Sequence, residues 1–254
     1  MTIEEIKEAI EDDRICIYIQ PIYSLKKEKF VSAEILARLI DKDGNIVMPK
    51  DFIPMTEHTK LMFPLEIKIL QKICDVLTRK DIESLELDYI EVNLSAKNAE
   101  KKRFLKEAQT IIDMNNIQHN TLNIEITESA TPYNETRFFK NLNLIRDNDF
   151  RISLDDFGTG ASNFQYLLNI PAKLIKLDMS LIQSAFSNEK SISIIHGMTL
   201  MTHSIGSKVV AEGVEDEKTL ELLKDLDVDY VQGYYFSKPL PVDEFIEFIK
   251  QKNQ

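Results

Sequence analysis

The sequence predicts an α/β fold, a single (β/α)8 barrel of the TIM type. The chain has 254 residues, and one barrel of this type commonly takes about 250. Short apolar runs typical of strands alternate with longer helical patterns along the chain. Most of these runs are continuously apolar, as expected for parallel strands that are buried on both faces. No Gly/Ser-rich or Pro-rich linker interrupts the pattern, so we expect one domain over residues 1–254. An open doubly wound sheet is the alternative architecture.

The elements follow from hydrophobic periodicity and from turn residues. The predicted strands are Ile15–Gln20, Phe30–Ala37, Tyr89–Leu94, Leu122–Thr127, Arg151–Asp155, Leu174–Leu177, Lys208–Ala211 and Tyr230–Gln232. The predicted helices are Pro64–Thr78, Lys102–Asp113, Asn134–Asp147, Ser191–Ser204, Glu217–Leu226 and Val242–Lys250. The first two strands are joined by the short polar turn 26–29, which indicates a hairpin. We therefore expect the first strand to run antiparallel to its neighbour.

Composition excludes several classes of protein. With 43% hydrophobic and 29% charged residues, the chain can bury a sizeable core. Its apolar stretches are interrupted well before about 18 residues, so we expect no membrane insertion. The first residues lack the basic and apolar regions of a signal peptide, which predicts a cytoplasmic protein. A net charge of −11 argues against binding to DNA or to nucleic acids in general.

Polar side chains end the predicted strands, and a parallel barrel gathers these ends on one face. In chain order they are Gln20, Glu34, Asn93, Glu125, Asp155, Asp156, Lys176, Glu212 and Gln232. Any one of them alone fits a strand end that faces water. Together, the carboxylates would repel one another strongly unless cations lay between them. Oxygen donors without Cys or His favour Mg²⁺ or Mn²⁺, and the adjacent Asp155 and Asp156 suit a pair of ions with one bridging carboxylate.

Short motifs in the chain resemble those of the EAL-domain cyclic di-GMP phosphodiesterases. The resemblance covers about residues 15–240 and is specific because the motifs occur in combination. They are Gln20-Pro21-Ile22, Glu34-Ile35-Leu36-Ala37-Arg38, Phe52-Ile53-Pro54, Val92-Asn93-Leu94-Ser95, Glu125-Ile126-Thr127-Glu128-Ser129, Asp155-Asp156-Phe157-Gly158-Thr159-Gly160, Ile175-Lys176-Leu177-Asp178, Ala211-Glu212-Gly213-Val214-Glu215 and Gln232-Gly233-Tyr234. The naming motif departs at its centre, where Ile35 stands for the family's Ala. Because this change removes no ligand, we expect it to tune activity.

The resemblance implies hydrolysis of cyclic di-GMP to linear pGpG with two Mg²⁺ or Mn²⁺ ions. One metal would be held by Glu34, Asn93, Glu125 and Asp155. Asp155 would bridge to a second metal that is also held by Asp156, with Glu212 close to that ion or its water. Lys176 would act as the general base or would orient the attacking hydroxide. Two neighbouring dications should lower the pKa of this lysine.

The resemblance also implies substrate contacts and a mobile loop. Arg38 would contact a phosphate, and Gln20 and Gln232 would hold the substrate by hydrogen bonds. Further substrate contacts are expected from Leu36, Asp178, Phe236 and Pro239, with a plain core role for Phe236 as the alternative. Glu128 would pin the loop that carries Gly158, Thr159 and Gly160, and Glu215 would support Glu212. The family commonly dimerises through the elements next to this loop, and a regulatory protein partner is compatible with the sequence.

Two rival functions remain at this point. One is a catalytically silent module that binds cyclic di-GMP and acts through a partner protein, although no metal ligand is missing here. The other is a different Mg²⁺ barrel enzyme, such as an enolase-type proton abstractor with Lys176 as base. That alternative leaves Gln20, Asn93 and the Asp155–Asp156 pair unexplained.

Overall fold

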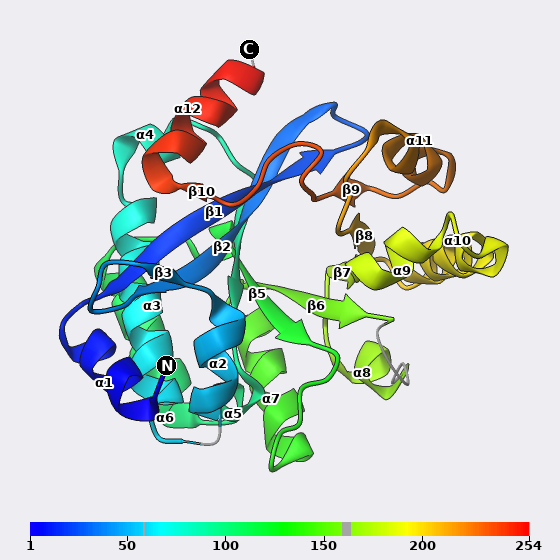
Figure 1. Cartoon of the computed structure of the whole chain (residues 1–254). Coiled ribbons are helices and arrows are strands. Elements are labelled where there is room, and N and C mark those ends of the chain that lie inside the picture. The colour runs from blue at the N-terminus through cyan, green and yellow to red at the C-terminus, as the bar shows by residue number, and fades with distance from the viewer. Residues whose placement is uncertain (58, 159–163, 254) are drawn as a thin grey trace.

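A closed barrel of strands forms the centre of the molecule (Figure 1). The computed structural model describes residues 1–57, 59–158 and 164–253. Among them, the ring is built by β1 (Ile15–Ser24), β2 (Lys29–Ile40), β4 (Tyr89–Asn93), β5 (Leu122–Thr127), β6 (Arg151–Phe157), β7 (Leu174–Leu177), β8 (Lys208–Ala211) and β9 (Tyr230–Val231). Neighbours from β2 round to β9 are parallel, and β1 is antiparallel to both β2 and β9. The barrel and its antiparallel first strand are therefore confirmed, and the open sheet is excluded.

Two short strands extend the sheet beyond the ring. β3 (Ile46–Val47) pairs antiparallel with the end of β2, and β10 (Leu240–Pro241) pairs antiparallel with β1. Neither was predicted, because two residues carry no periodic pattern.

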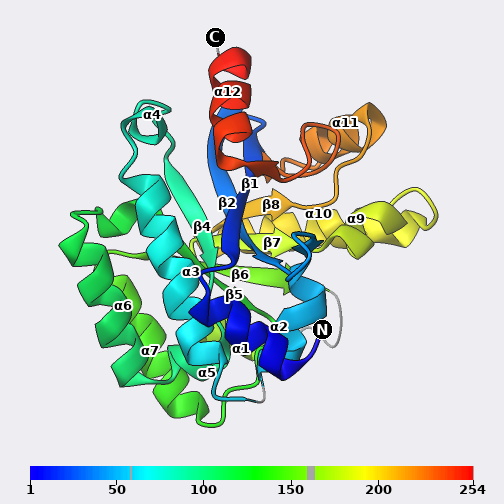
Figure 2. The same cartoon turned by 60° about the vertical axis from the view of Figure 1, so that its left-hand side comes forward.

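Helices surround the barrel (Figures 1 and 2). They are α1 (Ile3–Glu11), α2 (Pro49–Glu57), α3 (Met62–Leu77), α4 (Lys80–Glu83), α5 (Ala96–Ala99), α6 (Lys102–Met114), α7 (Glu135–Asp147), α8 (Phe164–Asn169), α9 (Met179–Ser184), α10 (Glu189–Ser204), α11 (Glu217–Asp225) and α12 (Val242–Lys252), with a short 3-10 helix at His119–Thr121. All six predicted helices are present within a few residues of their predicted bounds. None of the described helices is both long and apolar enough to cross a membrane.

The helix α1 was not predicted, although its sequence carries a clear start signal. Thr2 and Glu5 form a capping box, in which each side chain accepts a hydrogen bond from the other residue's backbone. Ile6 and Ala9 are fully buried in a small apolar cluster with residues of β2, α2 and α3. This cluster attaches the start of the chain to the barrel wall.

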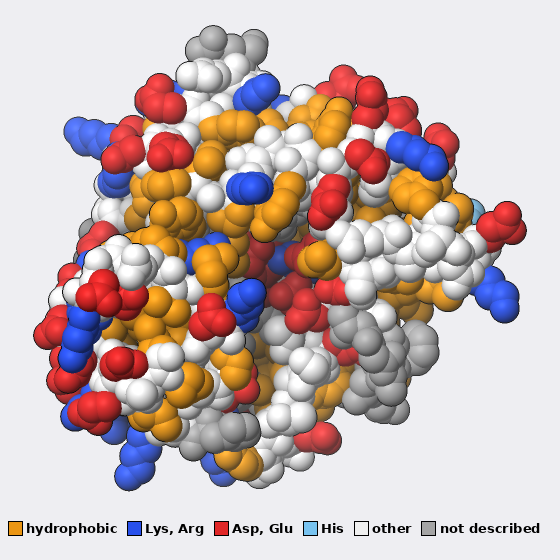
Figure 3. Space-filling model, in the orientation of Figure 1, with side chains coloured by type: hydrophobic (Ala, Val, Ile, Leu, Met, Phe, Trp, Pro, Cys, Tyr) orange, Lys and Arg blue, Asp and Glu red, His pale blue; other side chains and the backbone are white. Residues whose placement is uncertain are grey.

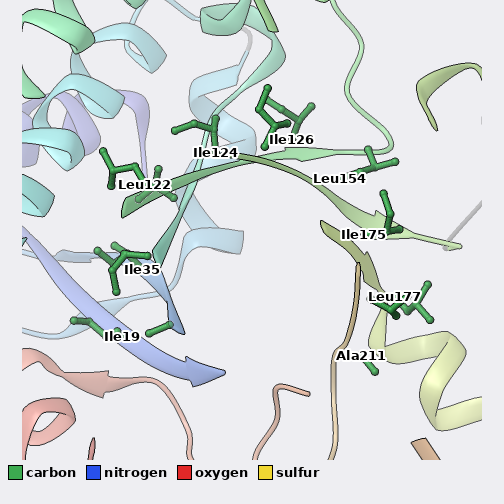
Figure 4. Close-up of a cluster of buried hydrophobic side chains, with 14 of the residues drawn as sticks. Ile19, Ile35, Leu122, Ile124, Ile126, Leu154, Ile175, Leu177 and Ala211 are labelled. Atoms are coloured by element: carbon green, nitrogen blue, oxygen red, sulfur yellow. The ribbon is translucent and has the colours of Figure 1, made fainter. Parts of the chain in front are cut away.

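The main core lies between the outer face of the barrel and the helices (Figure 4). Successive strand residues point to opposite faces, so the strand residues of this core, such as Ile90, Ile124 and Ile175, face outward. Ile35 belongs to this outer set and is only 3% exposed. The departure from the naming motif therefore falls in the packed core.

The same alternation directs polar side chains into the barrel. Glu91 and Asn93 alternate with Ile90 and Val92 on β4, and Asn123 and Glu125 do the same on β5. Toward the other end, a separate apolar cluster groups Ile22, Val31, Tyr89, Leu174, Val210 and Tyr230. The interior is thus apolar at one end and highly charged at the end where the site lies.

Candidate active site

Lys176 occupies the centre of the charged end of the barrel. Its side chain projects from β7 and is fully buried. The Nζ atom lies 2.5 Å from an oxygen of Glu125 and 2.7 Å from one of Glu212. It lies 3.5 Å from an oxygen of each of Glu34, Glu91 and Asp155. Figure 3 shows acidic side chains gathered in a hollow on this face. The geometry confirms the predicted convergence of the strand ends.

The charged groups of this cluster shift one another's pKa values. Burial by itself lowers the pKa of Lys176, but Asp155, Glu125 and Glu212 together raise that pKa well above its ordinary value. Burial also raises the pKa of Glu125 well above its ordinary value, and Lys176 only partly offsets this shift. A lowered pKa was expected for a lysine beside two dications. In the chain without metal ions the shift has the opposite direction, because carboxylates are its only close charges among the described residues.

Two amide side chains join the acidic residues. The Nδ2 atom of Asn93 donates to Glu34 over 3.3 Å and to Glu125 over 3.1 Å. The Nε2 atom of Gln232 donates to Glu34 over 2.7 Å and to Gln20 over 3.1 Å. Glu34 is therefore held from both sides.

The adjacent acids on β6 lie in a β-bulge. Leu154 pairs with Ile175 and Phe157 with Leu177, so Asp155 and Asp156 together lie opposite Lys176 alone. Asp156 has a φ of +56°, in the left-handed region that Asp adopts more readily than most residues. A regular strand would point these two side chains to opposite faces. The bulge turns both toward the same site.

Asp155, Asp156 and Glu212 form a cluster suited to a cation. One carboxylate oxygen of each lies within 4.8 Å of the others. Burial is the main cause that raises the pKa of Asp156 to about 6 and that of Glu212 to about 8. Carboxylates that are costly to ionise together fit a site that a dication neutralises. This hard oxygen donor set suits Mg²⁺ or Mn²⁺.

Two glycines allow other parts of the chain to approach closely immediately after site residues. Gly213 follows Glu212 with a φ of +71°, and a Cβ atom there would lie 2.3 Å from the Cβ of Met179. Gly233 follows Gln232, and a Cβ atom there would lie 2.1 Å from the carbonyl oxygen of Val214. A side chain at either position would displace the backbone beside the site.

A groove of about 530 Å³ opens beside Glu34 and Asn93. Leu36 lines this groove, together with residues of α2 and of the segment after β5. Arg38, two residues further along β2, is buried with its guanidinium 5.3 Å from the centre of the Tyr18 ring. Its Nη1 atom donates to the carbonyl oxygen of Ala37 over 2.9 Å.

Other predicted site residues have partners of their own. Asp178 caps α9 by accepting from the backbone N–H of Ser180 over 2.7 Å. Phe236 stacks on Tyr23 with ring centres 4.8 Å apart, and Pro239 is half-buried close by in sequence. Glu215 is exposed and accepts from Gln183 over 3.2 Å. Their roles toward substrate or toward Glu212 stay predictions.

Glu128 contacts the start of the loop after β6. Its Oε2 atom accepts a hydrogen bond of 3.0 Å from the backbone N–H of Gly158. The pinning of the loop stays a prediction, because its following residues Thr159 and Gly160 lie outside the described part of the chain.

Sequence reasoning missed Glu91. It is fully buried, its Oε2 lies 3.5 Å from Nζ of Lys176, and burial raises its pKa. The signal was present, because Glu91 lies two residues before Asn93 and therefore faces the same side of the strand. Glu91 was not predicted because only the last polar residue of each strand, here Asn93, was taken as a site residue.

The sequence profile of the EAL domain family matches residues 3–239. The chain belongs to the EAL domain family. It is 33% identical over 244 residues to the "Signaling protein YkoW" of Bacillus subtilis, covering 96% of this chain and 30% of that protein. It is 30% identical over 247 residues to the "Cyclic di-GMP phosphodiesterase NbdA" of Pseudomonas aeruginosa, covering 97% of this chain and 32% of that protein. The chain thus spans about a third of the length of these relatives.

Solved structures give the same assignment. "Structure of EAL Enzyme Bd1971 - cAMP and cyclic-di-GMP bound form" is 27% identical with a TM-score of 0.86, over 97% of this chain and 67% of that one. An EAL domain protein from Listeria monocytogenes is 29% identical with a TM-score of 0.79, over 99% of this chain and 98% of that one.

Proposed function

We propose that this chain hydrolyses cyclic di-GMP to linear pGpG with two divalent cations. The observation that carries the proposal is the convergence of Asp155, Asp156 and Glu212 around the buried Lys176, beside Glu34, Asn93 and Glu125. Relatives named cyclic di-GMP phosphodiesterases, and a structural neighbour solved with cyclic di-GMP, support the choice of substrate.

The proposed ligands divide into two sets. Glu34, Asn93, Glu125 and Asp155 hold one cation, and Asp155 and Asp156 hold the other with Glu212 close to it. Asn93 would turn its amide so that the oxygen faces the ion. When bound, two such cations activate a water and stabilise the charge that develops on the phosphodiester.

Lys176 is proposed to orient the attacking water through its N–H groups. Asp155 and Glu212 fix the ammonium from two sides, at 3.5 Å and 2.7 Å. A fixed donor contributes because the reacting atoms meet it without further reorganisation.

The substrate is proposed to lie across the open end of the barrel and into the groove beside Leu36. Arg38 would contact a phosphate, while Gln20 and Gln232 would hold the dinucleotide by hydrogen bonds. Asp178, Phe236 and Pro239 complete the proposed contacts. Gln20 already donates to the carbonyl oxygen of Ser237 over 3.2 Å, which ties this segment to the site.

The test is a product analysis. The purified chain is incubated with cyclic di-GMP and Mg²⁺ or Mn²⁺, and the products are separated by chromatography. We expect pGpG from the parent chain and from Glu221→Ala, a control on the exposed face of α11, and none from Glu34→Ala. Binding of cyclic di-GMP without turnover under both metals would contradict the proposal. It would favour the catalytically silent module that binds cyclic di-GMP and acts through a partner protein.

We also propose a homodimer through the face formed by α8, α9 and α10. Leu168, Met179 and Ile194 on these helices are 77%, 46% and 49% exposed. Figure 1 shows the three helices on the side of the barrel where β6 ends. Light scattering is expected to give a dimer mass for the parent chain and a monomer mass for Ile194→Lys. A monomeric parent chain would contradict this part.

Three further expectations stay predictions. They are the organisation as one domain over residues 1–254, a cytoplasmic location and a regulatory protein partner.

A further inference from the structure

Glu91 differs from the other carboxylates around Lys176 because it has no place in the proposed ligand set. Its Oε1 atom accepts a hydrogen bond of 3.0 Å from Nδ2 of Asn123. That same nitrogen donates to the hydroxyl of Ser153 over 3.1 Å. The Oε2 atom of Glu91 faces Nζ of Lys176 at 3.5 Å and has no hydrogen-bond partner among the described residues. One oxygen is thus fixed by the barrel and the other faces the ammonium.

Glu91 also lies deeper in the barrel than the proposed ligands. Asn123 pairs with Glu91, whereas Glu125 pairs with Asn93 one step closer to the strand ends. Glu91 and Asn123 are both fully buried. A cation bound between the strand ends would therefore lie on the opposite side of Lys176 from Glu91.

Binding of cations changes the balance of forces on the lysine. Glu34, Glu125, Asp155 and Glu212 would turn their oxygens toward the ions, and the ions would repel the ammonium. The carboxylate of Glu91 would keep its position, because the side-chain amide of Asn123 donates a hydrogen bond to its other oxygen. Attraction between unit charges at this distance is strong in a buried site.

We propose that Glu91 is a positioning residue, which holds Lys176 at its working position when cations occupy the site. The proposal rests on the ligand set of the proposed function. Its effect is expected only with the metal-loaded protein, since four other carboxylates surround the lysine in the metal-free chain.

The test compares Glu91→Gln with the parent chain in two states. Gln keeps the length of the side chain and an oxygen for Asn123, but removes the charge. The first readout is the ¹H–¹⁵N NMR signal of the Lys176 ammonium, assigned with Lys176→Arg, in the metal-free and in the Mg²⁺-loaded protein. We expect Glu91→Gln to keep this signal without metal and to lose it with Mg²⁺, while the parent chain keeps it in both states.

The second readout is steady-state kinetics. A displaced catalytic group can lower turnover about 100-fold, so we expect such a fall in kcat for Glu91→Gln with KM unchanged. Glu91→Asp retains the charge but places it one methylene further from Lys176, and its kcat is expected to fall only about 10-fold. Ser153→Ala is the matched control, because it alters the same hydrogen-bonded group without contact to Lys176, and its kcat and NMR signal should match the parent.

Several outcomes would overturn the proposal. They are an unchanged kcat in Glu91→Gln, a signal lost equally in both metal states, or the same loss in Ser153→Ala. If Glu91→Gln does not fold, an unchanged kcat in Glu91→Asp overturns it as well. A parent chain that binds Mg²⁺ and does not hydrolyse cyclic di-GMP overturns the proposed function alone, because the NMR contrast is measured without turnover.

Discussion

Glu128 and Gly158 are joined by a hydrogen bond of 3.0 Å from the backbone N–H of the glycine to the carboxylate. The backbone N–H of Glu128 in turn donates to the carbonyl oxygen of Asp155 over 2.8 Å. Glu128, which directly follows β5, is therefore bonded to β6 at Asp155 and to Gly158 just after that strand. Glu128 thus links the start of the loop after β6 to the backbone of the proposed bridging ligand, Asp155.

Replacement of Glu128 should affect the metal site without removing a ligand. Partners that orient metal ligands typically account for about 10- to 100-fold in affinity or activity. We expect Glu128→Ala to lower Mn²⁺ affinity and kcat by about 10-fold, measured by isothermal titration calorimetry and product chromatography. Glu135→Ala, an exposed acid in the first turn of α7, is the control. Equal affinities in the two variants would count against a role for the Glu128–Gly158 bond.

The left-handed backbone of Asp156 predicts a difference between two substitutions that both remove its charge. Asn adopts this conformation readily, whereas for Ala it costs about 1–2 kcal/mol. We expect Asp156→Asn and Asp156→Ala to lose one cation equally, and Asp156→Ala to unfold at lower urea concentration. Calorimetric stoichiometry and urea melts measure the two effects. Equal melts would show that the bulge relaxes when the acid is removed.

Gly213→Ala should destabilise the fold beside Glu212. Its φ of +71° disfavours Ala, and the new Cβ would meet the Cβ of Met179 at 2.3 Å and its Cα at 3.0 Å. Such overpacking costs about 1–3 kcal/mol in the free energy of unfolding. Gly44→Ala is a matched control, because Gly44 has a φ of +86° but a Cβ atom at that position would meet no atom within 4 Å. A similar loss in both variants would assign the effect to backbone conformation alone.

Metal binding should strengthen as pH rises through the region where the clustered acids ionise. The pKa of Asp156 is raised to about 6 and that of Glu212 to about 8. Because cations require the ionised carboxylates, Mg²⁺ binding should release protons between these values. Calorimetry in buffers of different ionisation enthalpy measures that release. Binding without proton release at pH 7 would contradict the prediction.

The same shifts give the metal-free protein an unusual stability profile. Folded-state pKa values above the unfolded ones mean that the folded chain binds protons more tightly. The contribution of these two acids to the free energy of unfolding is therefore most favourable below their ordinary pKa values. It is lost as pH rises toward about 6 for Asp156 and about 8 for Glu212. In EDTA the melting temperature should fall as pH rises over this range. Saturating Mg²⁺ should make this fall smaller.

Lys176→Met should remove both hydrolysis and the charge that balances the acids. Removal of one partner from a buried ion pair typically costs about 3–5 kcal/mol. We expect that loss in EDTA and a partial recovery of the free energy of unfolding in Mg²⁺, measured by urea denaturation. A variant as stable as the parent in EDTA would indicate that the surrounding acids are already protonated.

Much of the barrel and of its site could be predicted because both depend on periodic patterns. Apolar runs defined the strands, and their polar ends defined the site. The short helices α5 and α9 were missed, since they are set by the single capping residues Ser95 and Asp178 and are too short for a periodic signal. Glu91 was missed although alternation with Asn93 pointed to it. The bulge at Asp156 is a feature of backbone conformation, which hydrophobic patterning does not encode.

That bulge limits how this kind of centre can be transferred to another protein. On a regular strand, two adjacent acids would send one carboxylate into the barrel and the other into the core, where an unpaired charge destabilises the fold. A designer who grafts only the side chains would obtain half of the centre and a weakened scaffold. The unit to transplant is the backbone segment from Leu154 to Phe157, which carries the two acids, together with Lys176 opposite it.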